Sequence, residues 1–160
     1  PISALLFALR RSLPGLAVST DLMVGFPGET DEQFAASLSF VQACGFSRLH
    51  VFPYSPRPGT AAASFPGRLP RPVRESRSRE AVALGEESAR RFNESLLGKE
   101  LSVLVEEWRD GVCRGLAAQY VEVSFASESD LRGRIVPVTA TEADAASLRA
   151  NRSEPPPDPA

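Results

Sequence analysis

Residues 17–34, AVSTDLMVGFPGETDEQF, decide the fold class of the first half of the chain. The run 17–24 is short, apolar and rich in β-formers, which is typical of a largely buried parallel strand. A turn of glycines and proline follows. Thr30 and Gln33 then have the spacing of a capping box and predict the start of a helix. A strand, a tight turn and a helix in this order indicate an α/β fold with a parallel sheet.

The flanking segments extend this pattern. Residues 2–12 carry apolar side chains at helical spacing and predict a preceding helix. The helix after the turn ends at Gly45, and residues 49–52 predict a second strand. Two strands do not make a stable domain. We therefore expect residues 1–70 to be the last βα units of a larger sheet or barrel, and the sequence to start inside a longer protein.

The second half of the chain changes character. A loop rich in proline and glycine precedes a connecting helix at about 71–97. We expect the arginines of this helix to lie on its solvated outer face: Arg74, Arg77, Arg79, Arg90 and Arg91. From residue 98 apolar residues alternate with polar ones, which predicts a small β-barrel over 98–142. Residues 143–160 are expected to be a disordered tail.

Composition excludes several classes of protein. The 160 residues have a net charge of −2, which argues against a uniformly basic nucleic-acid binder. No apolar run approaches the roughly 20 residues of a membrane span. Cys44 and Cys113 form no zinc motif or disulfide framework, so we interpret them as buried thiols in a reducing cytosol. His50 is the single histidine, and we expect it to be packed on its strand instead of serving a Ser-His-Asp or Cys-His unit.

The GFPGET turn, residues 25–30, is the first candidate site. Loops at the carboxyl ends of parallel strands bind ligands. The glycines permit close approach, and the helix start offers N–H groups to an anion. The alternative is a tight turn that only starts a helix. Asp21, in the preceding strand, either faces a ligand or is satisfied by an arginine.

Two further segments carry candidate binding residues. In HVFPYSPRPGT, Tyr54 can stack on a base, and Ser55 and Arg57 can bond a polar ligand; the alternative is a plain proline-rich loop. Small barrels often bind RNA through basic and aromatic residues. Those available are Lys99, Arg109, Arg114, Tyr120, Arg132 and Arg134. The alternative there is an ordinary solvated sheet face.

GFPGET together with YSPRPGT, over roughly residues 15–140, resembles the C-terminal part of the radical S-adenosylmethionine (SAM) methylthiotransferases of the MiaB/RimO superfamily. The resemblance implies an α/β part followed by an all-β part. These would be the C-terminal units of a radical SAM partial TIM barrel, a long helix, and an OB-like TRAM barrel, which is a tRNA-binding module. SRLHVFPYS is most similar to the branch that modifies threonylcarbamoyladenosine-37 of tRNA. The isopentenyladenosine branch is close, and the ribosomal-protein branch is less similar.

The resemblance also implies a function. Such an enzyme adds a methylthio group to C2 of the adenine ring, using SAM and 4Fe-4S clusters, with tRNA as its partner. The family's CxxxCxxC cluster motif is absent from this sequence, so the cluster ligands are expected outside the chain, and the chain alone is expected to be inactive. A stand-alone RNA-binding protein, or a nucleotide-binding module that uses GFPGET, are the alternatives.

By position, the resemblance assigns residues to two sites and assigns no catalytic or metal-binding residue. The SAM site would comprise Asp21, Gly25, Phe26, Pro27, Gly28, Glu29, Phe52, Tyr54 and Ser55. The RNA-binding surface would comprise Lys99, Arg114, Tyr120, Arg132 and Arg134.

Overall fold

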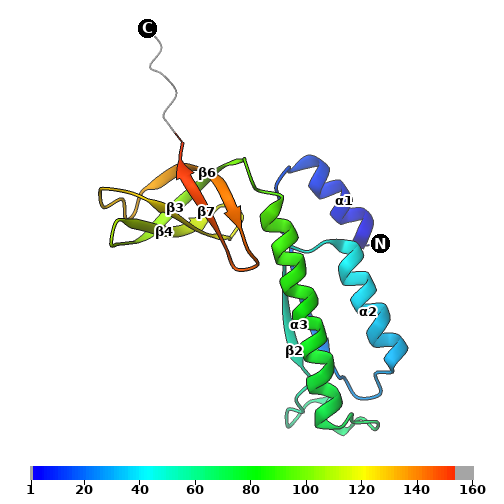
Figure 1. Ribbon diagram of the computed structural model, residues 1–160. Helices are drawn as coiled ribbons and strands as arrows, with labels where there is room; N and C mark the ends of the chain where they lie inside the picture. The colour runs from blue at the N-terminus through cyan, green and yellow to red at the C-terminus, as the bar shows by residue number, and fades with distance from the viewer. Residues whose placement is uncertain (1, 154–160) are drawn as a thin grey trace. The chain divides into compact units, whose positions relative to one another are not determined.

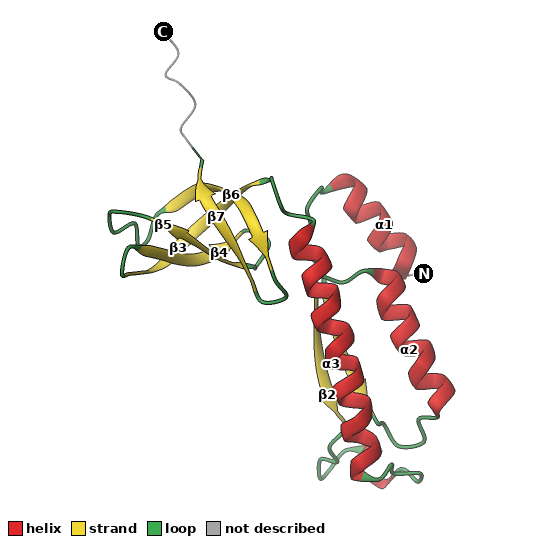
Figure 2. Ribbon diagram, viewed as in Figure 1, coloured by secondary structure: helices red, strands yellow, loops and turns green. Residues whose placement is uncertain are grey.

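The computed structural model describes residues 2–153, which divide into two compact units. The first unit contains residues 2–12 and 18–89, and the second contains 13–17 and 90–153. The first consists of helices and two strands, and the second is formed mainly by strands (Figures 1 and 2). The predicted order, α/β followed by all-β, is confirmed.

The elements of the first unit follow the predicted sequence. They are α1 (Ile2–Ser12), β1 (Ser19–Val24), α2 (Asp31–Cys44), β2 (Arg48–Pro53), a short 3-10 helix (Ala61–Ser64) and most of α3 (Arg71–Glu94). Thr30 and Gln33 form the predicted capping box at the start of α2. Gly45 ends that helix in the left-handed conformation, with φ of 58°. Local signals therefore set these boundaries.

β1 and β2 form a parallel two-stranded sheet, in which Ser19 lies opposite Arg48 and Val24 opposite Pro53. One face packs against helices through two small clusters. The first is built on Val24, Phe34 and Ala81, and the second on Leu6, Val41, Cys44 and Phe46. The other face is exposed, so the prediction of a largely buried strand is wrong: burial in β1 alternates, because nothing within the first unit covers that face. The radical SAM partial barrel stays a prediction.

The second unit is a closed five-stranded barrel with strand order β3-β4-β5-β7-β6. Its strands are β3 (Glu100–Arg109), β4 (Val112–Ala117), β5 (Glu122–Ala126), β6 (Ile135–Ala143) and β7 (Ser147–Arg152). Neighbouring strands are antiparallel except β5 and β7. The inward residues form one continuous core that includes Val103, Cys113, Val123, Val138 and Leu148. This architecture is consistent with a TRAM-like barrel.

The end of the barrel differs from the prediction. Residues 143–152 complete β6 and form β7, where a disordered tail was expected. Leu148 and Ala150 point into the core, and the intervening side chains are polar. The strand has only two inward residues, and one of them is alanine, so its alternation is weak in the sequence. The rest of the predicted tail, 154–160, lies outside the described residues. Within residues 2–153 no helix is both long enough and apolar enough to cross a membrane.

Candidate functional site

The exposed face of the β1–β2 sheet gathers residues of two kinds. Asp21 lies opposite His50, and Met23 lies opposite Phe52. Met23 is 53% exposed and Phe52 is 50% exposed, and because they are register partners they form one exposed apolar patch. An apolar pair therefore lies beside a pair of polar side chains near the carboxyl ends of two parallel strands. Such edges are where α/β sheets bind ligands. His50 is exposed on this face, so the prediction that it packs on its strand is wrong.

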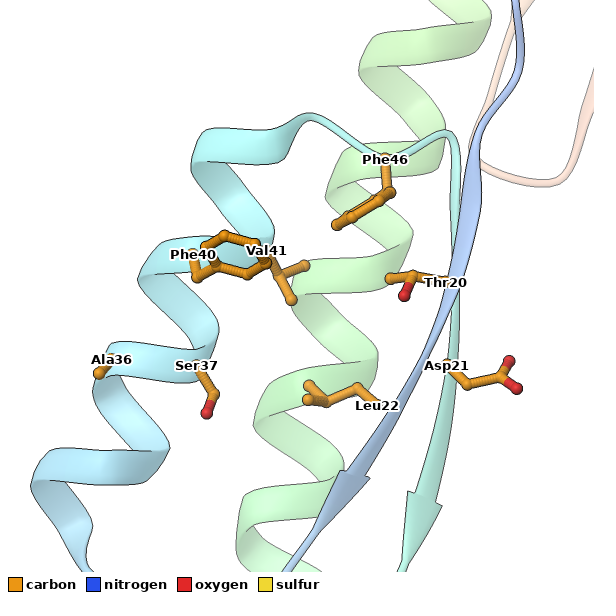
Figure 3. A pocket seen from close by; sticks show the side chains of 8 residues that line it. All are labelled: Thr20, Asp21, Leu22, Ala36, Ser37, Phe40, Val41 and Phe46. Atoms are coloured by element: carbon orange, nitrogen blue, oxygen red, sulfur yellow. The ribbon is translucent and has the colours of Figure 1, made fainter. Parts of the chain in front are cut away.

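The opposite side of β1 has a groove of a different kind. It encloses about 370 Å³ between β1 and α2. Its lining is mainly apolar: Thr20, Asp21, Leu22, Ala36, Ser37, Phe40, Val41 and Phe46. Figure 3 shows the side chain of Leu22 on the α2 side of the strand, with the carboxylate of Asp21 pointing away from α2. Asp21 therefore presents its charge to the exposed sheet face, as the ligand-facing alternative requires.

Backbone N–H groups of the GFPGET loop are held by partners within the protein. Gly25 and Gly28 have φ of 74° and 81°, which side chains rarely adopt. The Gly25 N–H donates to Glu29 Oε2 (2.7 Å), and the Gly28 N–H donates to the Gly67 carbonyl (2.9 Å). The Glu29 N–H donates to the Phe26 carbonyl (3.0 Å). Because these three donors are occupied, the loop does not offer them to an anion. The nucleotide-binding alternative therefore cannot rely on the N–H groups of Gly25, Gly28 and Glu29.

Glu29 is tied to the protein, not directed at a ligand. Its Oε2 accepts from Gly25 N and also from Arg77 Nη1 (2.5 Å). Arg77 Nη2 donates in turn to Asp31 Oδ1 (2.6 Å). Arg77 is only 6% exposed, so its predicted place on the solvated outer face of the helix is wrong. The helix turns this side chain toward the GFPGET loop and the start of α2, where Glu29 and Asp31 satisfy its charge.

Tyr54 is a structural residue of this edge. It is buried, and its ring meets Phe26 edge to face with centroids 5.2 Å apart. Its hydroxyl donates to the Ala62 carbonyl (2.8 Å), and its N–H donates to the Val24 carbonyl (2.8 Å). Tyr54 is therefore not free to stack on a base, as the sequence suggested. Phe26 remains partly exposed, Pro27 is half-buried, and Ser55 is exposed after β2.

The predicted RNA-binding residues lie in different settings on the barrel. Arg132 pairs with Asp130 (2.7 Å), so the two charges offset each other. Hydrogen bonds from the Arg132 side chain and backbone lower the pKa of that Asp130 carboxyl. Tyr120 is the most exposed large apolar residue and has φ of 59°. Lys99 and Arg134 are exposed.

Arg114 lies in a surface groove of about 390 Å³ together with Arg149 of β7. Arg149 was missed in the sequence because its strand was taken for a tail. Glu142 also lines this groove, and Arg149 lies 3.4 Å from it. The surface therefore carries both signs of charge, with two arginines that can contact phosphates.

Residues 2–153 contain no cluster of three or more histidine, cysteine, aspartate or glutamate side chains able to hold a metal. Cys44 is buried in the first unit and Cys113 in the barrel core, so the prediction of two buried thiols is confirmed. Neither cysteine fits an iron–sulfur cluster, which needs several thiolates together.

Comparison with known proteins identifies the family. The chain is 36% identical over 135 residues to the threonylcarbamoyladenosine tRNA methylthiotransferase MtaB of Bacillus subtilis, which covers 81% of the chain and 30% of that protein. It is 38% identical over 138 residues to the tRNA-2-methylthio-N6-dimethylallyladenosine synthase of Moorella thermoacetica (84% and 31%). The chain belongs to the MiaB/RimO superfamily of methylthiotransferases. No protein-family model matches it.

A third relative comes from the ribosomal-protein branch. The chain is 48% identical over 99 residues to the ribosomal protein uS12 methylthiotransferase RimO of Syntrophobacter fumaroxidans, covering 62% of the chain and 22% of that protein. The expected lower similarity to this branch is not seen in the identity, although the matched stretch is shorter. The chain spans less than a third of the length of these relatives.

Proposed function

We propose that the chain is part of a tRNA methylthiotransferase that adds a methylthio group to C2 of N6-threonylcarbamoyladenosine-37. The proposal rests on the exposed β1–β2 face, where Asp21, Met23, His50 and Phe52 lie together beside the GFPGET loop. A methylthiotransferase needs a surface that binds SAM, and this face has the required mixture of apolar and polar groups.

The residues present fit the organic part of SAM. Met23 and Phe52 offer apolar area to an adenine ring, and the Asp21 carboxylate suits a cationic ligand. When bound with an iron–sulfur cluster, SAM would supply the radical that attacks an unactivated C–H bond, and also the methyl group. The described residues do not fit the 4Fe-4S cluster itself. Its ligands would come from polypeptide outside this chain, and the chain alone would be inactive.

The barrel would bind tRNA. Arg114 and Arg149 in one groove, with exposed Lys99 and Arg134, supply positive charge, and Tyr120 supplies an exposed aromatic ring. Each phosphate contact contributes affinity that falls with salt. Arg132 would contribute less, because Asp130 holds its guanidinium.

The choice of threonylcarbamoyladenosine rests on the resemblance of SRLHVFPYS to that branch and on a match to MtaB across 81% of the chain. Isopentenyladenosine-37 is the second candidate, favoured by the Moorella relative, whose match covers 84% of the chain. To separate them, the full-length protein is reconstituted with iron, sulfide and SAM and given tRNA that carries one modified adenosine or the other. Methylthio product, detected by nucleoside mass spectrometry, is expected only with threonylcarbamoyladenosine.

Product with isopentenyladenosine alone would transfer the assignment to the second branch. A stand-alone RNA-binding protein would instead bind tRNA in gel-shift titrations and show no affinity for SAM. Equilibrium titration of SAM therefore separates the enzyme from this alternative before any activity is measured.

A further inference from the structure

Arg77 connects α3 to the GFPGET loop at two points and to the first residue of α2 at a third. Nη1 lies 2.5 Å from Glu29 Oε2 and 3.0 Å from the Glu29 carbonyl oxygen, and Nη2 lies 2.6 Å from Asp31 Oδ1. The guanidinium carbon also lies 5.2 Å from the centroid of the Phe34 ring. A forked guanidinium fixes the direction of two carboxylates at once, which a single ammonium cannot do.

The contact continues into the backbone of the loop. The Glu29 oxygen that binds Arg77 also accepts the N–H of Gly25, four residues earlier. One carboxylate therefore holds the first residue of the loop against its fifth, and Arg77 holds that carboxylate. The shape of residues 25–29 depends on a side chain that is 48 residues away in the sequence.

Arg74, one turn earlier on α3, restrains the same edge from a second side. Its Nη1 donates to the Tyr54 carbonyl, just after β2. Its aliphatic part crosses Gly25 so closely that a Cβ on Gly25 would lie 2.5 Å from Arg74 Cγ. The loops that follow both strands are thus held by adjacent arginines of one helix.

Stability alone does not require this arrangement. Burying an ion pair costs desolvation energy, and an apolar replacement of similar volume is often equally stable. Burial disfavours the charged guanidinium, but the hydrogen bonds that Arg77 donates to Asp31 and Glu29, together with the charges of these carboxylates, outweigh burial and raise the pKa of Arg77. The charges therefore persist, and what they add is a defined loop geometry.

We propose that Arg77, acting through Glu29, is a positioning residue that holds the GFPGET loop in the conformation that binds SAM. Glu29 then acts as a strut between helix and loop, and not as a cofactor ligand. This inference rests on the proposed function for its ligand, but the restraint on the loop is a property of this chain and can be measured separately.

The test uses the full-length protein with Arg77→Lys, Arg77→Met and Glu29→Gln. The matched control is Arg71→Met, because Arg71 lies on the same helix but makes an exposed pair with Glu75 (2.6 Å). Three quantities are measured: the Kd for SAM by calorimetry, amide hydrogen exchange of the peptide over 22–34, and the thermal unfolding midpoint.

We expect Arg77→Lys to weaken SAM binding about tenfold and Arg77→Met about 100-fold, because the apparent Kd rises as the population of the binding-competent loop conformation falls. Exchange of the loop amides should accelerate in both Arg77 variants. In Glu29→Gln, the SAM affinity and the exchange rate should both lie between those of wild type and those of Arg77→Met. The unfolding midpoint of Arg77→Lys should stay within a few degrees of wild type. The Arg71→Met control should match wild type in all three measurements.

Wild-type SAM affinity together with wild-type loop exchange in Arg77→Met would overturn the inference. If Arg77→Met fails to fold, Arg77→Lys decides in the same way. A wild-type protein that does not bind SAM would refute the proposed function. Amide exchange over 22–34 would then still test whether Arg77 restrains the GFPGET loop. Unchanged exchange in both Arg77 variants would refute the restraint, and faster exchange would support it.

Discussion

Gly115 on β4 lies where the backbone of β3 comes very close to β4. A Cβ at this position would lie 2.0 Å from the Leu104 carbonyl oxygen and 2.9 Å from Val105 Cα. The contact lies at a register irregularity between Val105 and Glu107, where β3 bends over β4. Backbone atoms cannot rotate away, so we expect Gly115→Ala to force the two strands apart.

The magnitude follows from the geometry. Restoring an ordinary contact of about 3.5 Å requires a shift of about 1.5 Å. Overpacking of this kind costs about 1–3 kcal/mol, and each ladder hydrogen bond lost adds about 1 kcal/mol. With one ladder hydrogen bond lost, we therefore expect a loss of about 2–4 kcal/mol in the free energy of unfolding. For a domain of roughly 60–100 residues, this loss lowers the unfolding midpoint by roughly 8–32 °C.

The assay is urea unfolding followed by tryptophan fluorescence. Trp108 is the single tryptophan of the chain and lies on β3, where its indole N–H donates to the Ser127 carbonyl (3.1 Å). Gly133→Ala is the matched control, because Gly133 has φ of 77° but open space around its Cβ position. It should cost only about 1–2 kcal/mol for the left-handed backbone. A loss in Gly115→Ala no larger than in Gly133→Ala would refute the steric argument.

Three further changes test other parts of the molecule. The N–H groups of Ser147 and Ala146 donate to the Asp144 carboxylate and lower its pKa. The ionised carboxylate therefore stabilises the barrel above pH about 4, and this stabilisation is lost as the pH falls through the lowered pKa. Asp144→Asn should lower the midpoint of Trp fluorescence unfolding at pH 7 and flatten its decline in acid; an unchanged pH profile would contradict this. Arg149→Ala should weaken tRNA binding and reduce the slope of log K against log salt by about 0.9, as measured in gel shifts; an unchanged slope would exclude a phosphate contact. Phe52→Ala should weaken SAM binding about tenfold, about 1.4 kcal/mol, in calorimetric titration, with little change in stability because the ring is half exposed; wild-type affinity would remove Phe52 from the site.

Local chemistry made much of the fold predictable. The capping box at Thr30, the glycine at 45 and the alternation from residue 101 are signals that act within a few residues, and each marks an element that the structure contains. β7 was missed because its local signal is weak: Leu148 and Ala150 are its only two inward-facing residues, too few to show a period of two.

The candidate site was only partly predictable, because burial and partners depend on distant residues. Asp21 was recognised as unusual, but only the sheet shows that it shares an exposed face with Phe52. Glu29 and Tyr54 were assigned to the ligand, yet their polar atoms are bound within the protein. Arg77 was placed in solvent because charge suggests exposure, and nothing near it in the sequence reveals its two carboxylate partners.

The order of strands in the barrel has a consequence for its synthesis. β7 is the last strand within the described residues 2–153, but it lies between β5 and β6, and its parallel pairing with β5 extends only over Glu122–Ser124. During synthesis the barrel can therefore close only after Arg152, the end of β7, has emerged from the ribosome. Until then the nascent chain carries β3, β4, β5 and β6 with two unpaired edge strands, β5 and β6. A stop codon before Ser147 would make that intermediate permanent and leave it prone to aggregation.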